Sequence, residues 1–248
     1  MLGGLLSLLS AAAFAFETVA TRRGVLKGTV AQAMAITVPL GVPIFLLFAL
    51  IFGAFATIGG FSTRAIVCLA CAGVVHFIWG RYCNYRASKA MGAILVAPVQ
   101  QSSMLITLVL AIIILDEHLT PLRIIGIGLV LLGPVLTYDT ARRAASAVDE
   151  QRKLFQPNYA EGYLFALLSA TGYGVSPILV RFALENKTLQ ASLAGGLISY
   201  IAATLAFALI MMWPGQWRHV RSLDPAAAKW FAVSGVCVCF AQMLRYMA

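Results

Sequence analysis

Charged side chains are scarce in this 248-residue chain. Lysine and arginine number 18, aspartate and glutamate only 9, and these four types make up 11% of the sequence. A soluble globular domain usually carries about 25% charged residues and about 45–50% apolar residues, whereas 61% of this chain is hydrophobic. So few polar residues could not cover so much apolar surface in water. The composition therefore argues against a soluble fold and indicates a polytopic membrane protein.

Catalytic signatures are also missing. The sequence has no glycine-rich phosphate loop, no GxSxG motif and no HExxH motif. Its longest polar stretch, about 25 residues, is too short for a soluble catalytic or ATP-hydrolysing domain. A membrane-embedded enzyme would need several clustered His, Asp or Glu side chains within the apolar runs, where only His76 and Glu17 occur. We therefore expect no enzymatic activity and no cofactor.

Cysteine and basic residues give no sign of a redox, metal or nucleic-acid site. Cys68 and Cys71 have CxxC spacing, but no second pair accompanies them, so we expect no disulfide and no metal. The net charge of +9 comes from short clusters between apolar runs. Such clusters are typical of helix ends beside lipid headgroups, and they lack the basic stripe that a nucleic-acid partner requires.

Long apolar runs are abundant. A bilayer core about 30 Å thick requires about 20 apolar residues per helix, and strands are excluded because open sheet edges cannot be satisfied in lipid. Prolines inside the runs, among them Pro39, Pro43 and Pro98, predict kinks. We predict an all-α fold with eight transmembrane helices, at about 2–21, 31–55, 65–83, 90–115, 121–138, 162–182, 190–213 and 229–247.

The stretch from 138 to 162 marks the best internal boundary, because it carries four basic and four acidic residues. It divides the chain into a first unit of five helices at 1–138, a polar linker at 139–161 and a second unit of three helices at 162–248.

The second unit begins like the first. A shift of 159 residues aligns Leu8–Ala11 with Leu167–Ala170 and places Glu17 opposite Ser176, and a shift of 161 aligns 79–87 with 240–248. Two matches at nearly one offset indicate an internal duplication. Because the first copy holds an odd number of helices, the second copy would lie inverted in the membrane. The second copy ends at the counterpart of Ala87, so we expect a C-terminally truncated form of a protein with two five-helix repeats.

Three stretches carry a family resemblance: YRA at 85–87, VAPVQ at 96–100 and LDEHLTPLRIIGIGLVLLGPVL at 115–136. They resemble the EamA family of the drug/metabolite transporter superfamily. The matching positions are Tyr85, Ala87, Pro98, Glu117, Gly126 and Gly133. The resemblance implies two inverted five-helix repeats, solute transport by alternating access and a multi-pass place in a bacterial inner membrane, with both termini in the cytoplasm.

Charge alone gives the opposite orientation. Loops after odd-numbered predicted helices carry 13 lysines and arginines, and those after even-numbered helices carry 5, which places the amino terminus outside by the positive-inside rule. Arg81 and Arg86 enter this count although they could line a cavity. We expect the topology that the family implies.

Polar residues inside the predicted spans are costly in lipid and therefore mark a candidate transport pathway. The fourth predicted helix carries a run of four, Gln100, Gln101, Ser102 and Ser103, which cannot share one face. Some of them line a cavity, or they bond to neighbouring helices. His76 lies one turn before Trp79 and either relays a proton or packs as a neutral, hydrogen-bonded ring.

Three further charges are candidate functional residues that also have structural interpretations. Arg81 either binds an anionic substrate or marks the membrane edge. Glu117 is most simply a helix cap. Glu17 either reaches towards the interface or forms a cavity-facing proton or cation site.

We expect a secondary transporter that exports small metabolites or drugs, driven by a proton, ion or solute gradient. Its partners would be a small-molecule solute, membrane lipids and a coupling proton or ion, and its oligomeric state is open. The alternatives are a flippase for a lipid-linked sugar, a membrane-embedded enzyme and a non-transporting scaffold.

Overall fold

The computed structural model describes residues 2–116, 120–121, 124–129, 132, 143, 156–184 and 188–247. Regular structure in these residues is helical throughout, which confirms the predicted all-α class. Seven described segments are long and apolar enough to cross a membrane: Gly3–Val25, Val30–Ile51, Thr63–Met91, Ala93–Leu115, Tyr159–Ala183, Leu189–Met211 and Pro225–Arg245. The predicted count of eight is not confirmed, because most of the fifth predicted helix (121–138) lies outside the described residues.

The first two spans differ in continuity. Helix α1 (Leu2–Val25) is unbroken, whereas the second span consists of α2 (Val30–Thr37) and α3 (Gly41–Ile51), followed by the short α4 (Phe55–Ile58). The predicted helix at 31–55 is therefore interrupted at residues 38–40. Pro39 lies in that interruption and has no backbone N–H for a helical hydrogen bond.

The third span extends further than predicted. Helix α5 (Thr63–Gly73), the π-helix η1 (Val74–Gly80) and α6 (Arg81–Met91) form one continuous span, so the predicted end at 83 is wrong by eight residues. The polar sequence after 83 suggested a helix end, but its side chains bond within the bundle: Arg86 Nε lies 2.7 Å from Glu161 Oε1. π-Helical turns are rare and often occur at functional sites.

Gly92 separates the third span from the fourth. Its φ of +90° is a left-handed backbone conformation that favours glycine. Helix α7 (Ala93–Gln100) follows, and α8 (Ser102–Leu115) continues after a turn at Gln101. Pro98, one of the prolines at which a kink is predicted, lies inside α7, two residues before that helix ends.

The second half contains three long helices and one short one. These are α10 (Tyr159–Ala183), α11 (Leu189–Met211), the unpredicted α12 (Gln216–Arg221) and α13 (Pro225–Met247). Helix α10 begins inside the stretch predicted as linker, and Asn158 caps it by accepting a hydrogen bond from the Glu161 N–H at 3.2 Å.

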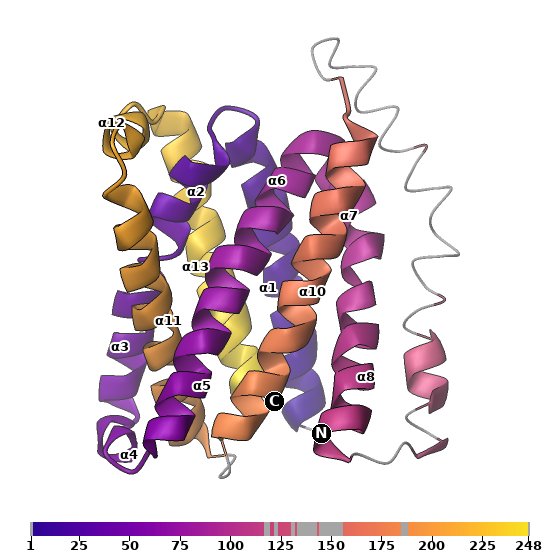
Figure 1. The fold of residues 1–248 in the computed structure, drawn as a ribbon, viewed down its shortest axis with the longest axis vertical. Helices are drawn as coiled ribbons and strands as arrows, with labels where there is room; N and C mark the ends of the chain where they lie inside the picture. Colours follow the sequence, from indigo (N-terminus) through magenta and orange to yellow (C-terminus); the bar gives the residue numbers. More distant parts are fainter. Residues whose placement is uncertain are drawn as a thin grey trace.

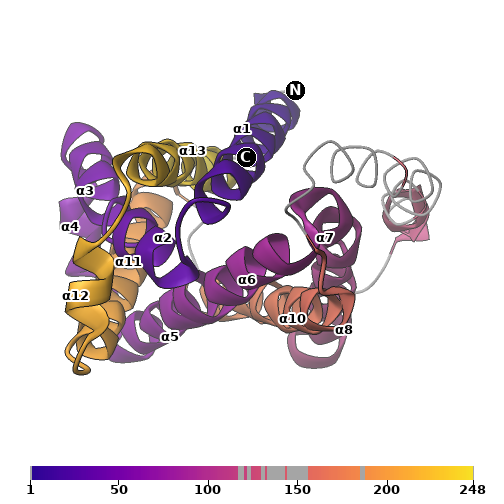
Figure 2. The same ribbon diagram turned by 90° about the horizontal axis from the view of Figure 1, so that it is seen from above.

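The long helices lie roughly side by side, with both chain ends at the end of the bundle opposite α12 (Figure 1). Helix α1 packs along α13, and α10 packs along α5, η1 and α6. Helix α11 contacts α3 and α5, while α13 contacts α2. Seen from above, α7, α8 and α10 form one side of the bundle, and α3, α11 and α12 the other (Figure 2).

Aromatic side chains and close glycine contacts form the core. The Phe77 and Tyr200 rings stack with centroids 3.9 Å apart, and Phe45 lies 5.0 Å from Tyr200. A Cβ at Gly73 would collide with the backbone of Ser199, so α5 and α11 can approach this closely only with glycine there. Large apolar side chains elsewhere point outwards, as lipid contact requires: Leu8, Phe16, Ile113, Leu205 and Leu209 are all exposed.

Candidate functional site: a polar cavity inside the bundle

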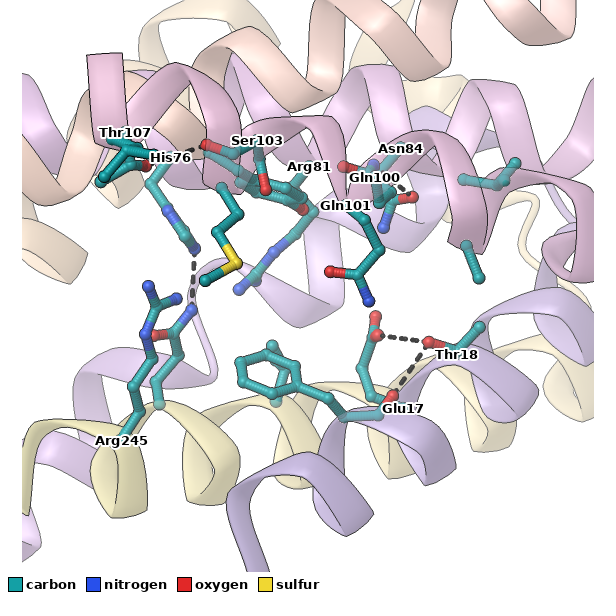
Figure 3. A pocket seen from close by; sticks show the side chains of 18 of the residues that line it. Glu17, Thr18, His76, Arg81, Asn84, Gln100, Gln101, Ser103, Thr107 and Arg245 are labelled. Carbon is teal, nitrogen blue, oxygen red and sulfur yellow. Dashed lines mark hydrogen bonds between the residues drawn. The ribbon is translucent and has the colours of Figure 1, made fainter. Parts of the chain in front are cut away.

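A cavity of about 940 Å³ lies within the bundle. Its walls come from α1, η1, α6, α7, α8, α10 and α13, with Gly126 and Ile127 adding to one side. Figure 3 shows polar side chains from these helices converging on it: Glu17, His76, Arg81, Asn84, Gln100, Gln101, Ser103 and Arg245. The cavity thus brings together polar residues from both ends of the chain, with Glu17 and Arg245 separated by 228 positions in the sequence.

Glu17 lies on α1 and is only 6% exposed. Its Oε1 accepts hydrogen bonds from Thr21 Oγ1 at 2.9 Å and from Ser234 Oγ at 3.4 Å. Thr18 Oγ1 is 3.5 Å from Oε2 but lies closer to the Phe14 carbonyl, at 2.9 Å. No ion pair to this carboxylate forms among the described residues. The carboxylate is therefore buried and hydrogen-bonded on one side, and it lines the cavity rather than the interface.

His76 lies in η1 and bonds to two other helices. Its Nδ1 is 2.7 Å from Ser176 Oγ on α10, and its Nε2 is 2.7 Å from Gln242 Nε2 on α13. The Gln242 amide donates to Nε2, so Nε2 is an unprotonated acceptor and the Nδ1–H donates to Ser176. The ring is therefore neutral in this arrangement and connects three elements beside the cavity.

Arg81 is 2% exposed and begins α6, directly after the π-helix. Its Nη1 donates to the Thr37 carbonyl at 2.9 Å and its Nη2 to Tyr200 Oη at 3.4 Å. Its guanidinium carbon lies 4.9 Å from the centre of the Phe77 ring. The side chain also lines the cavity, so Arg81 does not mark the membrane edge.

Amide side chains form the part of the cavity nearest Glu17 in Figure 3. Gln100 Nε2 donates to Asn84 Oδ1 at 3.1 Å and to Ser169 Oγ at 2.8 Å. Its Oε1 is buried and accepts no hydrogen bond from the part of the chain that the structure describes. Gln101 is exposed to the cavity and points towards Glu17 (Figure 3). This part of the cavity thus offers the Gln101 amide to a solute.

Two of the predicted pathway residues do not line the cavity. Trp79 is 51% exposed, and its Nε1 donates to the Leu168 carbonyl at 3.0 Å. Ser102 Oγ donates to the Val99 carbonyl at 2.6 Å within its own helix. Both residues therefore have local or packing roles in this structure.

Several cavity residues were not predicted from the sequence: Thr18, Asn84, Thr107, Tyr173, Gln242 and Arg245. Gln242 and Arg245 follow the same signal that identified Gln100, namely polar groups inside an apolar run. They are one turn apart on α13 and therefore share a face.

The family-motif positions have clear local roles where they are described. Tyr85 and Ala87 are fully buried in α6, Pro98 lies near the end of α7, and Gly126 lines the cavity. Glu117 and Gly133 lie outside the described residues.

The family profile of the "EamA-like transporter family" matches residues 1–138, more than half of the chain. The chain belongs to the EamA-like transporter family. This places it in the drug/metabolite transporter superfamily, and the seven described spans agree with an integral, multi-pass membrane protein. No curated protein matches the chain. The match covers α1 to α8, so it includes Glu17, His76, Arg81 and Gln101 but not α10 or α13.

Proposed function

We propose that this EamA-family protein is a secondary transporter that exports small metabolites or drugs, with the central cavity as its solute site. The observation that carries the proposal is a cavity of about 940 Å³ lined by a carboxylate, guanidiniums and amides within a bundle of apolar spans. Ionisable groups at this depth are costly and are typically retained where they face a pathway. The volume suits a small-molecule site.

The helix pairing supports alternating access as the mechanism. Helix α1 packs on α13, and α10 packs on α5, η1 and α6, so the first span of each half lies against the third span of the other half. We propose that the halves are inverted repeats and that these exchanged pairs rock against each other to open the cavity to each side in turn. The breaks at residues 38–40 and at Gly92 could absorb such motion.

Glu17 is the proposed coupling site. Its carboxylate lines the cavity and pairs with no described cation, and Thr21 and Ser234 hold it in place. A group in this position can take up a proton from one side and release it to the other as the cavity changes access. Coupling would follow because protonation of Glu17 changes the charge of the cavity and therefore how strongly the cavity binds its solute.

Counterflow in proteoliposomes tests the function. Purified protein would be reconstituted, loaded with single metabolites and assayed for uptake of the same radiolabelled compound across a panel. We expect at least one solute to be exchanged, and Gln101→Ala and His76→Ala to reduce its rate. Trp79→Phe is the matched control, because Trp79 lies outside the cavity and this change should leave the rate unchanged. A well-folded protein that exchanges no solute would contradict the transporter assignment.

A further inference from the structure

Arg81 is deeply buried in the bundle. It lies within the third span, ten residues before its end at Met91, which is about 15 Å along a helix. At 2% exposure it cannot reach the interface by extending its side chain. An arginine held this deep in lipid requires a partner for its charge, and no described carboxylate forms an ion pair with it.

The neighbours of Arg81 satisfy only part of its hydrogen-bonding capacity. Guanidinium offers five N–H donors and stays protonated in proteins. Two contacts are to neutral acceptors, the Thr37 carbonyl and the Tyr200 hydroxyl. The Phe77 and Tyr200 rings lie 4.9 and 5.9 Å from the guanidinium carbon and hold the group in position. Donors therefore remain on a fixed cation that lines the cavity.

The charges of the cavity do not balance. Among the described lining residues, Arg81 and Arg245 are cationic and Glu17 is the one carboxylate, while the bonds of His76 fix its ring as neutral. Figure 3 shows Arg245 beside His76, at the opposite end of the cavity from Glu17. The lining thus carries one net positive charge, and its buried cation, Arg81, forms no ion pair among the described residues, although a buried charge without a partner is costly. A solute with one negative charge would neutralise it, whereas a cation would add to it.

The remaining wall is apolar. Phe14, Val96, Met104 and Leu108 line the cavity alongside the polar groups. Resting on the proposed function, we propose that the solute is an organic monoanion with an apolar body, and that Arg81 and Arg245 bind its anionic group. This assigns the substrate class of the cavity from its charge and lining.

Three probes of nearly equal shape isolate the charge: phenylacetate, phenylacetamide and phenethylamine are an anion, a neutral amide and a cation on one aromatic skeleton. Their binding to the purified protein in detergent would be measured by isothermal titration calorimetry. We expect phenylacetate to bind at least about tenfold more tightly than phenylacetamide, since a charge-assisted hydrogen bond is roughly twice as strong as a neutral one. Phenethylamine should bind most weakly.

Single variants test whether Arg81 and Arg245 cause the preference for the anion. Arg81→Gln and Arg245→Gln should each abolish most of the preference for phenylacetate over phenylacetamide. Arg86→Gln is the matched control, because Arg86 is paired with Glu161 and does not line the cavity, so the preference should persist. Arg245 is exposed in the last turn of α13, so its variant should fold even if Arg81→Gln does not.

The outcomes separate this inference from the transport function. Equal binding of the anion and the amide, or tightest binding of the amine, would overturn the monoanion assignment. If the protein exchanged only amines in counterflow, the monoanion assignment would be wrong, but the transport function would stand. Binding of phenylacetate that depends on Arg81, in a protein that moves no solute, would support the assignment and contradict the transport function.

Discussion

Glu17 on α1 accepts a hydrogen bond from Ser234 on α13 at 3.4 Å, so the first span of one half is tied to the last span of the other. Ser176, the predicted counterpart of Glu17, makes the corresponding connection: its hydroxyl lies 2.7 Å from His76 in η1. Both positions therefore connect the first span of one half to the third span of the other. Only one of the two carries an ionisable group, so the two connections differ chemically.

Replacing Glu17 by glutamine should separate exchange from coupling. Glutamine keeps the shape and can still accept hydrogen bonds from Thr21 and Ser234, but it cannot take up a proton. We expect Glu17→Gln to fold, to retain counterflow and to lose accumulation driven by a pH gradient. Both rates would be measured in the same proteoliposomes. Unchanged gradient-driven accumulation would exclude Glu17 as the coupling site.

Removing the imidazole of His76 should lower the free energy of unfolding, because two buried polar side chains lose their hydrogen-bond partner. Ser176 and Gln242 are both buried, and in His76→Leu each loses its partner, at about 1–3 kcal/mol per group. The triple variant His76→Leu/Ser176→Ala/Gln242→Leu should recover much of this loss, since no unpaired polar group remains. Thermal unfolding in detergent measures both variants. A triple variant less stable than the single one would show that the hydrogen bonds are not the source of the loss.

Gly73 should not tolerate a side chain. A Cβ there would strike the Ser199 backbone, which cannot move aside without shifting α11. We expect Gly73→Ala to lower the free energy of unfolding by about 1–3 kcal/mol or more. Gly4→Ala is the control, because a Cβ at Gly4 meets nothing within 4 Å. Equal thermal midpoints for the two variants would mean that α5 and α11 are not packed this closely.

The ring of Tyr85 should contribute to the stability of the fold, whereas its hydroxyl should not. The ring is fully buried, but the hydroxyl makes no hydrogen bond of good geometry with any residue that the structure describes. Tyr85→Phe should therefore match or exceed the native stability, because it removes a buried unpaired group. Tyr85→Ala should lose about 3–5 kcal/mol through the cavity it leaves. A marked loss of stability in Tyr85→Phe would indicate a partner for the hydroxyl.

The spans were predictable because hydropathy alone decides whether a segment can lie in lipid. The ends of the spans were harder to predict. The third span passes position 83 because Tyr85, Ala87 and Met91 are buried within the bundle, where α6 packs on α10. Arg86 also pairs with Glu161, 75 residues away in the sequence, and no local pattern reveals these partners. The interruption at residues 38–40 was partly foreseeable, since Pro39 removes a backbone donor.

The sequence indicated that polar residues would line a cavity, but it did not indicate which of them would do so. Glu17, His76, Arg81 and Gln101 stood out as polar groups in apolar runs, and they line the cavity. Trp79 and Ser102 shared that signal but point elsewhere, because η1 and the turn at Gln101 change the helical phase around them. Which face a polar residue presents therefore depends on local winding that composition does not determine.

Filling the cavity tests the central claim, that it is the transport pathway. Ala97 lines the cavity on α7, so Ala97→Trp should obstruct it. Val109 on α8 is 50% exposed and does not line it, so Val109→Trp should be accommodated by lipid. The measurement is the initial rate of counterflow of the solute identified by the panel, in proteoliposomes with equal amounts of folded protein. We expect a loss of at least about tenfold for Ala97→Trp, equivalent to about 1.4 kcal/mol, and a near-native rate for Val109→Trp. Near-native rates for both variants would contradict it.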